Sequence, residues 1–309
     1  MMKKLVVIGG SGFVGRHFLD VLNGLPDYEV VFAIHRTEPE WLQSEAVART
    51  RFDIDDPSTL QPVLTQGCTV INLLRPDGSG WFEPAIGNIL KACEQARIKR
   101  YIHVSSIDVF GAVDNPVVDA GTPIKPKTPY ECEHAAAEAL VRGTRQAVFE
   151  VLVLRLGAIF GEGGLNIVSF VSEVSAAPLW KLALRRLLYG KRRMHLVSVQ
   201  KVVQTLAFVV NVPVIRQGEV VLVTDDASPE NNFGYLQDAL MREFERPALG
   251  YVPHLPLSLL GLLLRARGVS NSNPMRRFRE PRLAEWHQPE TADFKQQLHR
   301  YVAHLRKAG

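Results

Sequence analysis

The feature that most restricts the fold is the stretch "VVIGGSGFVGRHFLDVL", an apolar run that passes through glycines into a helical pattern. Gly9, Gly12 and Gly15 stand three residues apart in it. Glycines between a strand and a helix allow a tight turn and a close approach of backbone to a pyrophosphate, which the free N–H groups of the helix can bind. The stretch predicts a dinucleotide site, which Phe13 and Val14 would also line. The alternative is a glycine-rich turn for helix–strand packing alone.

The alternation of strand and helix continues through the first 160 residues. Apolar runs predict strands at 3–9, 29–34, 69–74, 100–106 and 149–156, and periodic patterns predict helices at 13–23, 57–66, 84–97 and 130–147. Nearly unbroken apolar strands are typical of a parallel sheet that is covered on both faces. The pattern therefore predicts an α/β fold with a doubly wound parallel sheet of the Rossmann type.

The pattern loosens after Gly157, which predicts a second region. We expect a dinucleotide-binding domain at 1–160, to which 191–228 contributes strands and a helix. A smaller, mostly helical substrate lobe would comprise 161–190 and 229–309. The apolar run 255–264 is too short for a bilayer span, which needs about 20 residues, and predicts a core helix. Contact with a membrane surface is the alternative, because Arg265 and Arg267 follow the run.

Charge and cysteine usage exclude several classes. The 36 basic and 32 acidic residues leave a net charge of +4, and the basic stretches 181–193 and 276–282 do not form a nucleic-acid-binding tail. Three widely spaced cysteines without a CxxC suggest neither a disulfide framework nor a metal site. The pair Glu131 and His134 is too little for a metal. We expect a cytoplasmic protein without a signal peptide, since "LVVI" runs straight into glycines.

The end of the second predicted strand bears on which dinucleotide would bind. The sequence there is "AIHRTEPE", with His35 and Arg36 in place of an acidic residue. A guanidinium suits a 2′-phosphate, so NADP is favoured over NAD, unless Arg36 is only a solvated loop residue. Asp53 could accept a hydrogen bond from the adenine amino group, or could serve a turn or helix cap. Ile54 and Leu73 complete the predicted cofactor contacts.

The motif order carries a family resemblance. With the glycine loop, "VSSIDVFG" and "PYECEHAAAE" in this order, the chain resembles the extended short-chain dehydrogenase/reductase family, the nucleotide-sugar epimerases and dehydratases. Ser106 takes the place of the family serine, and Tyr130, 24 residues later, begins the sequence that replaces YxxxK. The match covers most of residues 4–210. It implies a nucleotide sugar or similar secondary alcohol or ketone as substrate, and a homodimer through the helices predicted at 84–97 and 130–147.

The resemblance also implies residue roles. Tyr130 would exchange a proton with a substrate oxygen while the nicotinamide exchanges hydride, and Ser106 would hydrogen-bond the same oxygen. In the family a lysine holds the nicotinamide ribose and lowers the pKa of the tyrosine by its charge. Arg155, Arg192 and Arg193 would bind the substrate, although the last two could instead belong to a solvated basic surface.

Position 134 departs from the family, because it holds histidine instead of lysine. Four residues make about one helical turn, so Tyr130 and His134 share a face and could both reach a cofactor. His134 could donate to the nicotinamide ribose as a weak replacement for the lysine. An ordinary histidine pKa of about 6.5 leaves the ring mostly neutral, and Tyr130 would lose a fixed positive charge. Arg75 and Trp81 would crowd the nicotinamide end. The favoured hypothesis is an NAD(P)-dependent reductase, epimerase or dehydratase; the rival is a dinucleotide-binding sensor or assembly module with impaired chemistry.

Overall fold

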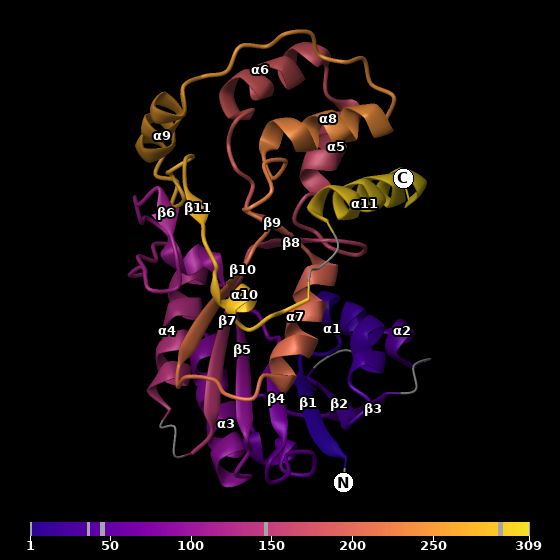
Figure 1. The fold of residues 1–309 in the computed structure, drawn as a ribbon, viewed down its shortest axis with the longest axis vertical. Helices are drawn as coiled ribbons and strands as arrows, with labels where there is room; N and C mark the ends of the chain where they lie inside the picture. The colour runs from indigo at the N-terminus through magenta and orange to yellow at the C-terminus, as the bar shows by residue number, and fades with distance from the viewer. Residues whose placement is uncertain (1, 36–37, 44–46, 145–147, 290–292, 309) are drawn as a thin grey trace.

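A parallel sheet of seven strands, in the order β10-β7-β5-β4-β1-β2-β3, forms the lower part of the structure (Figure 1). The structure is a computed structural model, and it describes residues 2–35, 38–43, 47–144, 148–289 and 293–308. The strands are β1 Lys3–Ile8, β2 Tyr28–Ile34, β3 Ala48–Arg51, β4 Thr69–Asn72, β5 Arg100–Ser106, β7 Glu150–Leu156 and β10 Glu219–Val223. The predicted doubly wound α/β sheet is confirmed.

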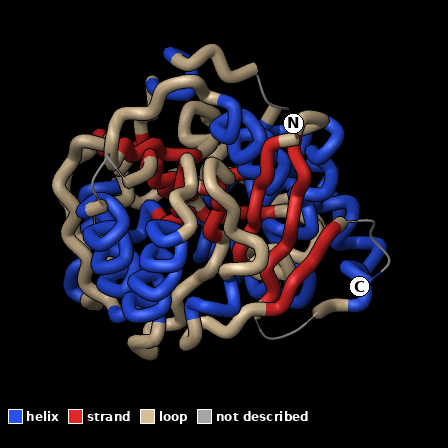
Figure 2. The backbone as a smooth tube through the Cα atoms, turned by 90° about the horizontal axis from the view of Figure 1, so that it is seen from below, coloured by secondary structure: helices blue, strands red, loops and turns tan. Residues whose placement is uncertain are grey.

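Helices cover both faces of this sheet (Figure 2). On one side, α1 Phe13–Phe18, η1 Leu19–Gly24 and α7 Val199–Asn211 pack on a core that includes Leu5, Phe32 and Leu206. On the other side, α3 Phe82–Gln95 and α4 Pro129–Gly143 pack on a core that includes Val6, Tyr101 and Val153. Successive strand residues therefore face different helical layers, as the apolar strands predict.

Two local predictions were wrong. The strand β3 was missed because its sequence ARTR carries no apolar run and lies largely exposed at the sheet edge. The helix predicted at 57–66 is only the 3₁₀ helix η2 Pro57–Leu60, which the side chain of Asp56 caps by accepting from the backbone N–H of Ser58. A capped proline start does not by itself sustain a longer helix.

The upper part of Figure 1 is mostly helical. The helices α5 Val168–Ala176, α6 Leu179–Tyr189, α8 Phe233–Glu243 and α11 Phe294–Ala308 surround a separate apolar core. The short strands β8 Ala158–Phe160 and β9 Leu196–Ser198 pair in parallel beneath it, and β6 Val117–Val118 pairs with β11 Arg277–Phe278. The remaining short elements are α2 Glu40–Gln43, η3 Ile107–Phe110 and α10 Arg282–Glu285.

The C-terminal segment does not belong to the upper part alone. Leu283 and Trp286, in and just after α10, pack against the core of the lower sheet. Arg282 pairs with Glu219 of β10 at 2.5 Å. The chain then returns upward to α11 (Figure 1), so the segment 229–309 contributes to both parts.

The helix predicted from the apolar run 255–264 is α9 Leu257–Ala266. Only one face is buried, through Leu260 and Leu264, while Leu262 is 61% exposed. The expectation of a core helix therefore holds for half of its surface. In the described part of the chain, we find no helix with the length and apolarity that a bilayer crossing requires.

Candidate functional site

The glycine loop lies where β1 passes into α1. Gly9 has φ +77°, a backbone conformation that side chains rarely adopt, and a Cβ at Gly15 would lie 2.0 Å from the carbonyl oxygen of Gly10. Helix α1 therefore needs glycine at 15 to approach the loop this closely. A Cβ at Gly12 would meet only ordinary contact, which leaves that side open. The loop thus retains the close backbone approach that a pyrophosphate requires, and a dinucleotide fits it.

A cleft of about 430 Å³ adjoins the loop and is lined by Gly9, Ser11, His35, Pro39, Leu74, Arg75 and Trp81. His35 thus lies where the sequence predicts a cofactor contact. Val14 and Leu73 line a second cavity of about 250 Å³. Both hollows share Leu74 and Arg75, so a ligand in the cleft can extend toward the second cavity.

The other predicted cofactor contacts are more distant from these hollows or lie outside the described residues. Phe13 packs edge-on against His17, with ring centroids 5.3 Å apart. A carboxylate oxygen of Asp53 accepts from the backbone N–H of Asp55 at 3.0 Å, which matches the turn alternative. Ile54 is buried. Arg36, on which the preference for NADP depends, lies outside the described residues.

The second cavity, which we call the catalytic cavity, brings together Ser106, Asp108, Tyr130, His134 and His195. Ser106 ends β5, and its hydroxyl both accepts from the Asp108 backbone N–H and donates to the Asp108 carboxylate at 3.1 Å. Burial raises the pKa of Asp108, and the hydrogen bond from Ser106 opposes the rise. A carboxyl beside a phenol gives the cavity a second group that can exchange a proton with a substrate.

Tyr130 occupies the first turn of α4, and local sequence fixes that turn. Thr128 and Glu131 form a capping box, in which the Thr128 hydroxyl accepts from the Glu131 N–H and the Glu131 carboxylate accepts from the Thr128 N–H at 3.1 Å. Pro129 supplies the favoured proline at the helix start. Burial raises the pKa of Tyr130, the guanidinium of Arg75 opposes the rise, and Asp108 adds to it.

His134 lies one turn further along α4, and its Nδ1 is 3.4 Å from the hydroxyl of Ser105. That hydroxyl donates to Glu138 at 2.6 Å, so its single hydrogen is used. The Ser105 oxygen can therefore only accept from His134, which places the ring hydrogen on Nδ1. The Nε2 atom is then an acceptor, and it is buried without a hydrogen-bond partner among the described residues.

Burial keeps this histidine uncharged. It lowers the pKa of His134 from 6.5 to about 3, with a further contribution from His103. Burial alone lowers the pKa of His103 to about 4. An uncharged ring cannot supply the positive charge that the family lysine provides, as the sequence predicts.

His103 has the opposite hydrogen arrangement. The Asn72 carbonyl accepts from the Leu74 N–H, so its amide donates to His103 Nδ1 at 3.3 Å. The hydrogen of His103 is then on Nε2, which is also buried without a partner among the described residues. Both rings contact Phe82, at centroid distances of 6.2 and 5.7 Å. A spare donor on one ring and a spare acceptor on the other are complementary, and one enclosed water could satisfy both.

The structure places Arg155 away from the predicted substrate role. Its guanidinium lies 4.7 Å from the Phe110 ring and donates to both oxygens of Glu138, the shortest contact being 2.6 Å. Arg155 and Glu138 are 2% and 1% exposed. A guanidinium committed to a buried carboxylate is a structural partner of α4, and Arg155 does not line the described catalytic cavity.

A basic cleft of about 560 Å³ lies in the upper part, with Arg186, Lys191, Arg193, His254 and Arg277 in its lining. Arg193 also donates to the backbone carbonyl of Asp226 at 2.8 Å. Arg192 is half-buried and does not line this cleft among the residues described. Of Arg192 and Arg193, which the sequence predicts as substrate contacts, Arg193 is therefore the one that lies beside other positive charges.

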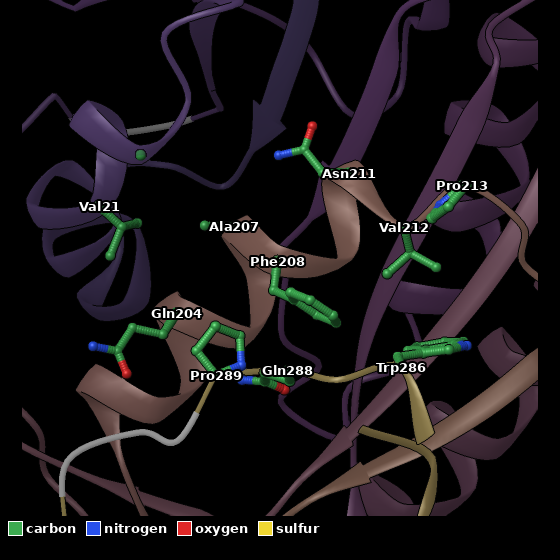
Figure 3. Close-up of a pocket in the computed structure, with 11 residues that line it drawn as sticks. Val21, Gln204, Ala207, Phe208, Asn211, Val212, Pro213, Trp286, Gln288 and Pro289 are labelled. Atoms are coloured by element: carbon green, nitrogen blue, oxygen red, sulfur yellow. The ribbon is translucent and has the colours of Figure 1, made fainter. Parts of the chain in front are cut away.

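A further cavity of about 580 Å³ lies between η1, α7 and the segment 286–289, and its lining includes Val21, Gln204, Phe208, Trp286 and Gln288 (Figure 3). None of its described lining residues is titratable. It lacks the proton-transferring groups that the catalytic cavity holds, and we assign it no chemistry.

Two site residues were missed from the sequence. Asp108 could have been noticed from its place two residues after Ser106. His195 has φ +52°, and its Nδ1 lies 2.8 Å from the Asp226 carboxylate. No local sequence pattern predicts this pair. In the described part of the chain, no group of three or more potential metal ligands occurs.

The fold and this cavity define a dinucleotide-binding protein of the doubly wound class, with a tyrosine at the carboxyl edge of the sheet. Residues 5–224 match the model of the NAD dependent epimerase/dehydratase family. The chain belongs to that family.

Individual relatives are more distant. The chain is 27% identical over 183 residues to a dTDP-glucose 4,6-dehydratase of Actinoplanes sp., covering 51% of this chain and 57% of the relative. It is 31% identical over 186 residues to the dTDP-D-glucose 4,6-dehydratase of Homo sapiens, covering 52% of each. The matched regions thus span about half the length of these curated relatives.

Solved structures show the same fold over nearly the whole chain. The dTDP-glucose 4,6-dehydratase DesIV from Streptomyces venezuelae, solved with NAD and TYD bound, has a TM-score of 0.73 at 18% identity and covers 98% of this chain and 97% of its own. A UDP-N-acetylglucosamine 4-epimerase from Methanobrevibacter ruminantium M1 has a TM-score of 0.75 at 18% identity, covering 100% and 99%.

Proposed function

We propose that the protein is a nicotinamide-dinucleotide-dependent enzyme that epimerises, dehydrates or reduces a nucleotide sugar. The observation that carries the proposal is the convergence of Tyr130, Ser106 and Asp108 in a cavity that shares Leu74 and Arg75 with the cleft beside the glycine loop. A phenol, a hydroxyl donor and a carboxyl of raised pKa can move protons at one substrate carbon and its neighbour.

The glycine loop and His35 would hold the dinucleotide, and Val14 and Leu73 would contact its nicotinamide end. When bound, the nicotinamide accepts and returns a hydride. The preference for NADP over NAD depends on Arg36 and stays a prediction. The curated relatives named above are dehydratases of a dTDP-sugar, which supports a nucleotide diphosphate as the handle of the substrate.

Tyr130 would take the proton of a substrate hydroxyl as hydride leaves the same carbon, and would return it in reverse. Ser106 would hold that oxygen by a hydrogen bond, once its hydroxyl turns from the Asp108 carboxylate to the substrate. Asp108 would protonate a leaving hydroxyl if the reaction is a dehydration. Arg193, with Lys191 and Arg277 beside it, would bind the diphosphate in the basic cleft.

The test begins with ligand binding and ends with turnover. Thermal unfolding is followed with NAD⁺, NADP⁺ and a panel of UDP- and dTDP-sugars, because a ligand of the native state raises the unfolding temperature. Hydride exchange is then measured with substrates deuterated at the reacting carbon. Tyr130→Phe should lower turnover by about 10² to 10⁴-fold. Tyr251→Phe, which alters a tyrosine that is 94% exposed, is the matched control. Unchanged turnover in Tyr130→Phe would refute the assigned role.

The uncharged state of His134 favours a second candidate, a dinucleotide-binding sensor or assembly module without chemistry. Its signature is a dinucleotide-dependent rise in unfolding temperature with no isotope exchange for any sugar in the panel. Stereospecific isotope exchange would eliminate it.

A further inference from the structure

Arg75 lines the catalytic cavity together with Tyr130 and the buried His134. Its guanidinium carbon is 5.3 Å from the centre of the Tyr130 ring. Arg75 is exposed, lines both the catalytic cavity and the cofactor cleft, and makes no ion pair with a carboxylate of the described residues. It therefore presents a cation to the phenol without a competing internal partner.

Several contacts fix the segment that carries Arg75. At its start, the Leu74 N–H donates to the Asn72 side chain at 3.1 Å. At its end, the N–H groups of Gly78 and Gly80 donate to the carboxylate of Glu133 on α4, the first at 3.0 Å. Both ends are thus held by the elements that flank Tyr130, which positions Arg75 relative to the phenol.

We propose that Arg75 supplies the positive charge that the family lysine would provide, and so sets the acidity of the Tyr130 phenol. The inference rests on the proposed function, since it concerns the same acid/base. The groups that face Tyr130 are Arg75 from the end of β4, Asp108 and Ser106 from the end of β5, and the uncharged His134 on α4. Arg75 is the cation of this set. A guanidinium is in general a permanent cation in proteins.

In this arrangement the positive charge beside Tyr130 comes from the loop after β4, whereas in the family it comes from the helix that carries the tyrosine. A lysine at position 134 would bring a cation from α4, whereas Arg75 comes from the segment after β4 and also lines the cofactor cleft. When Tyr130 takes the proton of a substrate hydroxyl, the transient phenolate is stabilised by the guanidinium. The charge of Asp108 has the opposite effect, because it raises the pKa of Tyr130. Ser106 aligns the substrate oxygen.

The experiment measures the pKa of Tyr130 directly in the protein without ligands. Tyrosine labelled with ¹³C at Cζ is titrated by NMR, and the Tyr130 signal is assigned by its loss in Tyr130→Phe. Arg75→Met should raise the Tyr130 pKa by about one unit or more and lower turnover at pH 7 about tenfold or more. Arg75→Lys should keep most of both properties. Arg300→Met, which removes an exposed arginine of α11, is the matched control and should change neither.

A charge relocation makes the test specific. In Arg75→Met/His134→Lys, the lysine restores a cation at the position it has in the family, so the Tyr130 pKa should fall again and turnover should recover. A residue that only supports the fold would not be replaced in this way. Circular dichroism confirms that each variant is folded.

The outcomes separate this inference from the proposed function. An unchanged Tyr130 pKa in folded Arg75→Met overturns the inference, whatever the turnover. If Arg75→Met raises the Tyr130 pKa but the parent protein exchanges no hydride with any nucleotide sugar, the inference holds and the proposed function fails. If the parent turns over and Arg75→Met turns over equally well, Arg75 is not the charge that Tyr130 uses.

Discussion

Arg75 and Arg155 both approach helix α4, Arg75 at Tyr130 and Arg155 at Glu138. Each guanidinium also lies over an aromatic ring, at 5.3 Å from Tyr130 and 4.7 Å from Phe110. Arg155 is buried and is neutralised by Glu138. Arg75 is exposed and faces both the catalytic cavity and the cofactor cleft. The difference teaches that the environment of a cation decides its role: a buried, paired guanidinium holds the fold, and an exposed one remains available to a reacting group.

The largest change in stability is expected when the buried Arg155 is replaced. Arg155→Met leaves Glu138 uncompensated in the interior and should lower the free energy of unfolding by about 3–5 kcal/mol. Urea unfolding measures it. The double variant Arg155→Met/Glu138→Leu should recover most of the loss, because no unpaired charge remains. A loss below about 1 kcal/mol in the single variant would contradict the structural role.

The buried histidines give the next largest effect. Their pKa values in the folded state, about 4 for His103 and about 3 for His134, lie below the ordinary value of about 6.5. The unfolded chain therefore binds more protons, and stability falls as the pH falls below about 6.5. Lowering the pH from 7 to 5 should reduce the free energy of unfolding by about 2 kcal/mol for each histidine.

Urea unfolding at several pH values tests this second prediction. The variant His103→Gln lacks one titrating ring and should lose less stability on acidification than the parent. An identical pH dependence in parent and variant would show that His103 takes up its proton equally in both states.

A smaller effect is expected where α4 begins. Thr128→Ala removes the hydroxyl that accepts from the Glu131 N–H. It should lower the free energy of unfolding by about 1 kcal/mol. Thr144→Ala is the control, because Thr144 caps the other end of α4 through its backbone N–H, which alanine retains. If both variants lose equal stability, the capping box does not hold Tyr130 in place.

The smallest change in stability is expected when the exposed Arg75 is replaced. Arg75→Met should change the free energy of unfolding by no more than about 0.5 kcal/mol, since exposed side chains without buried partners contribute little. Chemical unfolding of this variant beside Arg155→Met gives the direct comparison. A loss of several kcal/mol would mean that Arg75 is part of the fold and would remove the distinction between the two arginines.

The sequence predicted what depends on local pattern. Apolar runs revealed the central strands, and the spacing of Gly9, Gly12 and Gly15 revealed the turn before α1, because both signals are confined to a few neighbouring residues. The polar edge strand β3 gave no such signal. Tyr130 and Ser106 were found by their order, and the structure brings both to the catalytic cavity.

The partners of charged residues were harder to foresee. Arg155 looked like a substrate ligand because its motif is shared with the family, but the carboxylate that neutralises it lies on another element, 17 residues away. Arg75 looked like an obstruction, because the sequence does not show that the segment after β4 is tied to α4 through Glu133. Pairing across elements is decided by packing, which a single sequence does not display.

The route of the chain between the two parts has a consequence for synthesis. Strand β10 completes one edge of the sheet, yet α5 and α6 of the upper part are translated before it, and Trp286, which packs on the lower core, comes later still. A nascent chain on the ribosome therefore cannot complete the lower sheet before much of the upper part has emerged. Until then, β7 lacks its outer neighbour β10, and its unpaired edge is open to pairing with another strand.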